Sequence, residues 1–277
     1  MPLLKSRIPF TPQNPYRTRR PQTSKIIFLS CEGSVTEEEY FTRISEIYSM
    51  IRSKIQLISV AEDAVLTRPK FRTPEQNRIL GKTRPKQLVE RIDQFKAEKE
   101  DIYQFSQFPE DEFWIVTDVD QNWSNQIIDL QHGKSYRDEW NEAIAACQEK
   151  GYKYAVSNPF FEIWLLLHHD EASSEDKGYA VTDTHPYEKT EHFQERLRIL
   201  GVPMQEKKHI NDMDYTDEKV KTAVHRADML HIDKADLAPK YFSTTVYLLL
   251  QEIISMLPED VSLTSENEQV PSVVADS

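Results

Sequence analysis

The sequence contains few cysteines and glycines, and its charge balance is not basic. Two cysteines, Cys31 and Cys147, cannot build a disulfide framework and do not have the spacing of zinc ligands. Six glycines among 277 residues argue against fibrous and low-complexity classes. The formal net charge of −12 means that the surface as a whole repels nucleic acid and anionic membranes. A nucleic-acid-binding function would therefore need a local basic patch or a bound cation.

Long hydrophobic runs are also missing. The longest apolar stretches are about half of a membrane span, and the N-terminus has no signal-peptide-like core. We therefore expect a soluble, cytoplasmic protein with no membrane contact. Composition divides the chain into a flexible basic arm at 1–24, one folded domain at 25–257, and an acidic, disordered tail at 258–277.

Short apolar runs alternate with amphipathic helical patterns over the first part of the domain. Four strand-like runs, which include "KIIFLSC", "EFWIVTD" and "KYAVS", are each followed by a pattern with helical spacing. Thr36 and Glu39 have the spacing of a capping box, and Gly151 stands where a helix C-cap belongs. Beyond about residue 171 the pattern is helical. This order predicts an α/β fold with a mostly parallel sheet between helices and a helical C-terminal part.

Two aspartates, Asp118 and Asp120, stand at the end of the apolar run "EFWIVTDVD". In an extended segment alternate side chains face the same way, so the two carboxylates would point together at the edge of the sheet where ligands bind. Their repulsion is costly unless a cation lies between them, and oxygen ligands suit Mg²⁺ or Mn²⁺. For an isolated Asp-x-Asp, a simple turn is the more common explanation.

Other polar groups follow neighbouring strands. Glu32 comes after "KIIFLSC", and Gly33 then frees the backbone for a tight turn. Asn158 and Glu162 come after the strand "YAVS". Asn158 could instead cap the next helix, with Pro159 at its first position, and Glu162 could serve the helix dipole. Convergence of three strand ends favours the metal site over the turn.

Four blocks, in this order, carry a resemblance to a known family: "CEGSVTEEEYF", "TDVDQ", "SNPFFEIWLLLHH" and "STTVYLLLQEI". They resemble the RloB family, also called AbiLii-like, which belongs with the Toprim-fold phage-defence proteins. The resemblance covers about residues 25 to 255. It implies a Toprim-like core in which Glu32, Asp118 and Asp120 serve magnesium-dependent phosphodiester chemistry.

The resemblance also implies roles for further residues. Glu37 matches the family's Thr-Glu pair, where an acid could help to hold a second metal ion; a favourable first-turn acid is the alternative. Asn158 and Glu162 fall on the family's own Asn-Pro block. Lys208, in a lysine pair with Lys207, is a candidate for neutralising transition-state charge, although an exposed lysine pair is the plainer interpretation.

A long basic segment between 61 and 86 supplies candidates for phosphate contacts, which would make binding depend on salt. The residues that we expect to bind nucleic acid, together with the N-terminal arm, are Arg68, Lys70, Arg72, Arg84 and Lys86.

The resulting hypothesis is a metal-dependent nuclease effector of an anti-phage system of the abortive-infection type, acting on DNA or RNA. The alternative is a non-catalytic partner or regulator of an ABC-type ATPase, which the resemblance leads us to expect nearby in the genome. A topoisomerase- or primase-like enzyme ranks lower, because neither a catalytic-tyrosine domain nor zinc-ribbon spacing is present. The substrate class and a homo-oligomeric state stay open.

Overall fold

The computed structural model describes residues 25–33, 35–58, 84–129, 133–204 and 209–258. The expectations for the basic arm and for nearly all of the acidic tail lie outside these residues. So do those for Arg68, Lys70, Arg72 and Lys208.

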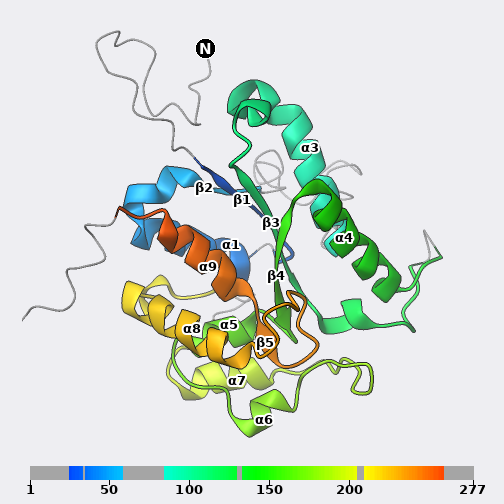
Figure 1. Ribbon diagram of the computed structural model, residues 1–277. Helices are drawn as coiled ribbons and strands as arrows, with labels where there is room; N and C mark the ends of the chain where they lie inside the picture. The colour runs from blue at the N-terminus through cyan, green and yellow to red at the C-terminus, as the bar shows by residue number, and fades with distance from the viewer. Residues whose placement is uncertain (1–24, 34, 59–83, 130–132, 205–208, 259–277) are drawn as a thin grey trace, which may run out of the picture.

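A five-stranded sheet forms the centre of the molecule (Figure 1). Its strands are β1 (Ile27–Cys31), β2 (Ile55–Leu57), β3 (Glu112–Asp118), β4 (Lys153–Asn158) and β5 (Ser243–Thr244). They are ordered β2-β1-β3-β4-β5; the first four are parallel, and β5 runs antiparallel to β4. The carboxyl ends of β1, β3 and β4 therefore meet at one edge, which confirms the predicted α/β fold.

Helices connect the strands and complete the C-terminal part. Those between and after the parallel strands are α1 (Thr36–Ile47), α3 (Pro85–Tyr103), α4 (Tyr136–Lys150) and α5 (Glu162–Leu167). They are followed by α6 (Ser174–Lys177), α7 (His192–Ile199), α8 (Asp217–Leu230) and α9 (Val246–Ser255). The 3₁₀ helices are η1 (Ser49–Lys54), η3 (Phe105–Gln107), η4 (Asp120–Trp123) and η6 (Asp212–Asp214). In Figure 1, α3 and α4 cover one face of the sheet, and α1 and α9 cover the other.

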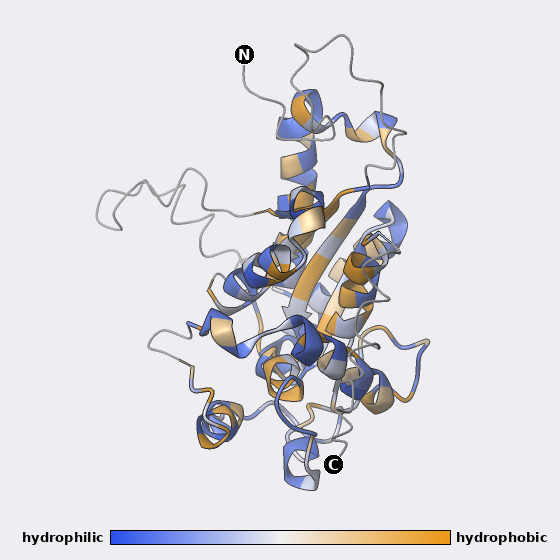
Figure 2. Cartoon of the chain, turned by 90° about the vertical axis from the view of Figure 1, so that its left-hand side faces the viewer, coloured by the Kyte–Doolittle hydropathy of each residue, from blue (hydrophilic) through white to orange (hydrophobic). Residues whose placement is uncertain are grey.

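Side-chain alternation along the strands builds two apolar layers. Ile27 and Leu29 pack into the layer under α1, α5, α8 and α9. Phe28 points to the other layer, where its ring stacks on Phe113 with centroids 4.9 Å apart and meets Tyr103 edge-on. Apolar colour runs along the central strands in Figure 2, while the helices also carry hydrophilic residues. This burial on both faces fixes which strand residues can reach the edge of the sheet.

Helix ends agree with the sequence in one case and differ in another. Gly151 has a left-handed conformation, with φ 69°, at the C-cap of α4, as predicted. The capping box at Thr36 is wrong: Val35 is the N-cap of α1, without a side-chain hydrogen bond. Glu39 instead contacts His209 and accepts the backbone N–H of Ile210 at 2.9 Å. Glu39 therefore joins α1 to a distant loop and does not cap its own helix.

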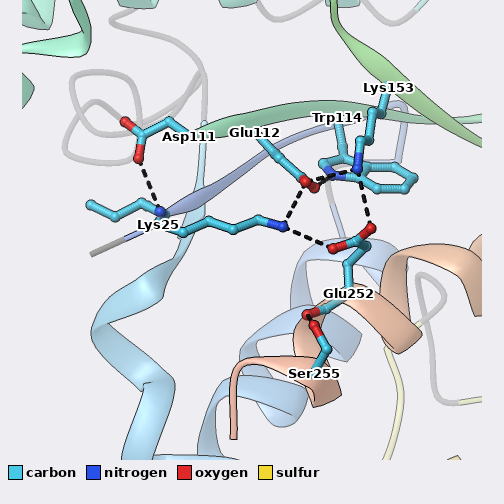
Figure 3. A network of polar contacts seen from close by, with 8 residues as sticks. Lys25, Asp111, Glu112, Trp114, Lys153, Glu252 and Ser255 are labelled. Carbon is cyan, nitrogen blue, oxygen red and sulfur yellow. Dashed lines mark hydrogen bonds and ion pairs between the residues drawn. The ribbon is translucent and has the colours of Figure 1, made fainter. Parts of the chain in front are cut away.

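An alternating set of charges joins the beginnings of three strands to α9 (Figure 3). The Lys25 ammonium lies 2.6 Å from Glu112 and 2.8 Å from Glu252. Lys153 lies 2.7 Å and 3.2 Å from the same two carboxylates. The indole N–H of Trp114 donates to Glu112 at 2.9 Å. Each carboxylate thus lies between two ammonium groups at the edge opposite the carboxyl ends of the strands.

This network should contribute to stability in a pH-dependent way. The hydrogen bond from Lys25 holds the pKa of Glu252 below its usual range. Its contribution is therefore present above the unfolded-state pKa and is lost as the pH falls through the folded-state pKa. Because these groups are partly exposed, we expect Glu252→Gln to lower the free energy of unfolding by about 0.5–1 kcal/mol at pH 7.

Urea denaturation of the wild type and of Glu252→Gln at pH 7 and at pH 3 measures the difference in their free energies of unfolding. It should shrink at the lower pH. The exposed Glu149→Gln on α4 is the control, with no change expected. An equal cost of Glu252→Gln at both pH values would contradict the assignment.

Candidate active site

Acidic side chains converge at the carboxyl edge of the sheet. Each of them comes from the end of a strand or the beginning of the helix that follows it. They are Glu32, Glu37, Asp118, Asp120 and Glu162. The pKa of Asp118 is raised well above its usual value, first by burial and then by the charges of the other four. The structure thus brings together the five acidic residues that the sequence suggested.

Glu32 is held in a fixed orientation between β1 and β3. Its Oε2 accepts the hydroxyl of Thr117 and, at 3.1 Å, the backbone N–H of Asp118. Its Oε1 accepts the side-chain amide of Asn122 at 3.3 Å. Burial, and next the charge of Asp120, raise the pKa of Glu32 to about 8, although the three hydrogen bonds act in the opposite direction. The hydrogen bonds set its position, while its acidic neighbour disfavours its charge.

Asp120 reaches the cluster through a turn and not through an extended strand. β3 ends at Asp118, and Asp120 begins η4 with φ 20°, a rare backbone conformation for a residue with a side chain. Its Oδ1 accepts the N–H of Asn122 at 3.1 Å, and its own N–H donates to Pro159 at 3.3 Å. The expectation that Asp118 and Asp120 alternate along one strand was wrong, because the turn replaces strand geometry.

Asn122 is a site residue that the sequence analysis missed. Its side chain is almost completely buried and donates both to Glu32 and, at 3.0 Å, to the carbonyl of Asp118. It therefore joins η4 to the ends of β1 and β3. The only signal in the sequence was an amide two residues after Asp120.

Gly33 permits the position of Glu37. The Gly33 N–H donates to Glu37 Oε1 at 3.0 Å, and a Cβ on Gly33 would lie 1.8 Å from Glu37 Oε2. The φ angle of Gly33 is not positive, so glycine is not needed here for a left-handed backbone conformation. The glycine is needed because a buried carboxylate occupies the space of a side chain.

Glu162 and Asn158 have different surroundings. Glu162 is buried at the start of α5, accepts a hydrogen bond from Gln194 at 3.4 Å, and acts on Asp118 by its charge. Asn158 is the last residue of β4, and the helix-cap prediction for it was wrong, as was the helix-start position of Pro159, because α5 begins only at Glu162.

The amide of Asn158 holds two loops in place. It exchanges two hydrogen bonds of 2.8 Å with the backbone of Val181, and it donates to the carbonyl of Pro239 at 2.9 Å. The amide nitrogen donates to both loops and the amide oxygen accepts from one of them, so Asn158 supports the site without facing it.

Arg84 and Lys86 lie at the beginning of α3. The guanidinium of Arg84 pairs with Asp129 and Glu139 and lies over the ring of Tyr136, with 4.7 Å between the guanidinium carbon and the ring centroid. Lys86 lies 3.4 Å from a carboxylate of α4, that of Glu142. These pairs fasten α3 to α4, and the expected phosphate contacts of both residues stay predictions.

The donor set suits a hard divalent cation in chemistry and charge. All five site carboxylates offer oxygen, and the pKa values of Glu32 and Asp118 are raised first by burial and then by the neighbouring carboxylates. Within the described ranges, no group of three or more His, Cys, Asp or Glu side chains is already arranged to hold an ion. The structure therefore provides suitable ligands without a finished coordination shell.

A family model described as RloB-like protein matches residues 27–253. The chain belongs to the RloB-like family. The match begins with β1 and reaches into α9, so it includes all five strands and confirms the resemblance found in the sequence. No curated protein and no solved structure matches the RloB-like chain. Of the helices that the structure describes, none has the length and apolar character needed to cross a bilayer.

The raised pKa of Glu32 predicts a fall in stability with increasing pH. Its folded-state pKa of about 8 exceeds the usual value near 4.5, so the folded protein binds more protons than the unfolded chain between these values. In EDTA, the free energy of unfolding should fall as the pH rises from 5 to 8. We expect Glu32→Gln to reduce that fall by about 2 kcal/mol, a value discounted for partial exposure.

Chemical denaturation at several pH values measures the effect. Glu149→Gln, which removes an acid from the α4 surface, should leave the slope of the wild type unchanged. If Glu32→Gln and the wild type had the same slope, the carboxyl would be ionised throughout, and our description of its environment would be wrong.

The close approach at Gly33 predicts an energetic coupling with Glu37. Gly33→Ala should displace the Glu37 carboxylate and lower the free energy of unfolding by about 1–3 kcal/mol. In a Glu37→Ala background the same substitution should cost much less, because the obstructing carboxylate is absent. Chemical denaturation of the wild type, the two single variants and the double variant completes the double-mutant cycle. Strictly additive changes in the free energy of unfolding would contradict the contact.

Proposed function

We propose that this RloB-like protein is a divalent-metal-dependent nuclease with a Toprim-like core, acting as the effector of a prokaryotic anti-phage system of the abortive-infection type. The observation that carries the proposal is the convergence of five carboxylates at one edge of the parallel sheet. A purely structural role would not explain the electrostatic cost of this cluster. The defence role rests on the family resemblance.

Glu32, Asp118 and Asp120, assisted by Glu37, are the residues that would hold Mg²⁺ or Mn²⁺. Such an ion, when bound, stabilises charge on the phosphoryl group and lowers the pKa of water. It would also relieve the repulsion between an acidic site and an anionic strand. Asn122 and Thr117 keep Glu32 oriented through their hydrogen bonds, so its carboxyl group is already in position before the ion or the substrate binds.

Glu32 has two candidate roles, ligand and general base. As a base it would accept a proton at Oε1, which has the single long hydrogen bond from Asn122. A base needs a pKa near the working pH; burial raises the pKa of Glu32, and a bound cation would lower it again. A ligand would instead lose its proton on metal binding.

A nucleic-acid substrate and an ABC-type ATPase are the proposed partners. Large apolar side chains are exposed near the end of α8 and in the segment before β5, where Met229, Ile232 and Tyr241 are 70%, 87% and 69% exposed. Exposed apolar residues of this kind favour contact with another protein. We expect the ATPase to be required if the isolated chain does not cleave.

Cleavage of labelled DNA, RNA and tRNA with Mg²⁺ or Mn²⁺ tests the function. Asp120→Asn should reduce cleavage at least about a hundredfold. The asparagine oxygen can still accept the N–H of Asn122, so the turn should persist while the charge is lost. Asp212→Asn, in the exposed 3₁₀ helix η6, is the matched control and should cleave normally.

Metal-dependent cleavage that survives in Asp120→Asn would assign the activity elsewhere. If the wild type cleaves no nucleic acid even with the ATPase encoded nearby, the nuclease proposal is wrong, and the role of a non-catalytic regulator is favoured.

A further inference from the structure

Two hydrogen-bond donors converge on a single carboxylate oxygen, that of Asp183. The indole N–H of Trp123 donates to Asp183 Oδ1 at 3.1 Å, and Arg137 Nη1 donates to the same oxygen. The guanidinium carbon of Arg137 lies 4.0 Å from the ring centroid of Trp123, within the range of a cation–π contact. An anionic oxygen is therefore held by a cation and a neutral donor at once.

Trp123, one member of this pair, belongs to the same short helix as Asp120. Trp123 ends η4, which begins with Asp120, and the backbone N–H of Trp123 donates to the carbonyl of Val119 at 3.1 Å. Arg137 lies in the first turn of α4, and its backbone N–H donates to Ser124 at 3.1 Å. One helical turn thus separates Trp123 from Asp120 along the chain, and Arg137 contacts Trp123.

Both donors are anchored, whereas the acceptor is not. Trp123 meets the buried Trp140 edge-on, with ring centroids 6.2 Å apart. The Arg137 side chain is 22% exposed, but that of Asp183 is 68% exposed. Exposed ion pairs add little to stability, so another anion can replace this carboxylate at low cost. Lys240 also acts on Asp183 by its charge, which adds to the positive potential there.

We propose that Trp123 and Arg137 form the subsite that receives a backbone phosphate oxygen of the nucleic-acid strand, and that Asp183 occupies this subsite in the free protein. The inference rests on the proposed function, since it assumes a nucleic-acid substrate. A chain with net charge −12 needs a local cation beside its acidic site to hold a polyanion. Arg137 supplies it, and guanidinium groups suit phosphate oxygens.

The proposal predicts opposite effects for the two members of one ion pair. Arg137→Gln removes the phosphate contact, so the Kd for a strand should rise about tenfold. Asp183→Asn removes the competing anion, so the Kd should fall severalfold. If the pair served only to hold its loop, neither substitution would change binding, and both would lower the midpoint of thermal unfolding.

Fluorescence anisotropy of labelled single-stranded DNA and RNA, with Ca²⁺ in place of a catalytic metal and also in EDTA, measures these constants. Glu195→Gln and Arg198→Gln are matched controls, because they break an exposed pair on α7, where the side chains are 52% and 64% exposed. Tryptophan emission gives a second readout. Trp114, Trp140 and Trp164 are buried, so a change on binding reports on Trp123 and should vanish in Trp123→Phe.

Opposite shifts in Kd for Arg137→Gln and Asp183→Asn, with the controls unchanged, support the subsite. They would do so even if no cleavage occurred, in which case only the nuclease proposal would fall. Metal-dependent cleavage with the Kd and KM of both variants unchanged would overturn the subsite and leave the nuclease intact. AMP is the probe for a free phosphate; if it changed the emission of Trp123 at the same concentration as the strand, the assignment to a strand would be wrong.

Discussion

Repulsion between carboxylates at one edge of the sheet is the constraint on which the rest of this structure depends. The parallel strands β1, β3 and β4 end side by side, so the acids that follow them cannot separate. Neutral groups donate hydrogen bonds to Glu32; they are the Thr117 hydroxyl, the Asn122 amide and the backbone N–H of Asp118. These bonds orient the carboxyl group, while its raised pKa favours the neutral form. The carboxyl group of Glu32 is therefore held in one orientation, and the proposed cation would relieve the repulsion around it.

The sequence was sufficient to predict the alternation of strands and helices, because apolar periodicity is a local property. It was also sufficient to place Glu32, Asp118 and Glu162 at one edge, since parallel topology brings strand ends together. The turn at Asp120 and the role of Asn122 could not be predicted. Asn122 donates to Glu32, which follows β1, and the backbone N–H of Asp120 donates to Pro159, which follows β4; no local pattern encodes these contacts.

Polar residues that suggested local roles have long-range ones in the structure. Glu39 contacts residues about 170 positions away in place of its own helix end. Asn158 binds the backbone of two later loops and does not cap α5. In each case the partner is distant in sequence, so capping rules that consider four or five neighbouring residues choose the wrong one. Arg84, considered as a phosphate ligand, similarly joins two helices.

The attachment of Val181 to Asn158 decides how the neighbouring Asp183 can move. The next residue, Thr182, forms a closed turn with His185, through a backbone hydrogen bond of 2.8 Å and a side-chain hydrogen bond of 2.9 Å. The turn holds the backbone on both sides of Asp183, whose side chain is 68% exposed. The proposed exchange of Asp183 for a phosphate would then need only rotation about side-chain bonds, which at exposed positions takes picoseconds to nanoseconds. It would require no opening of the fold.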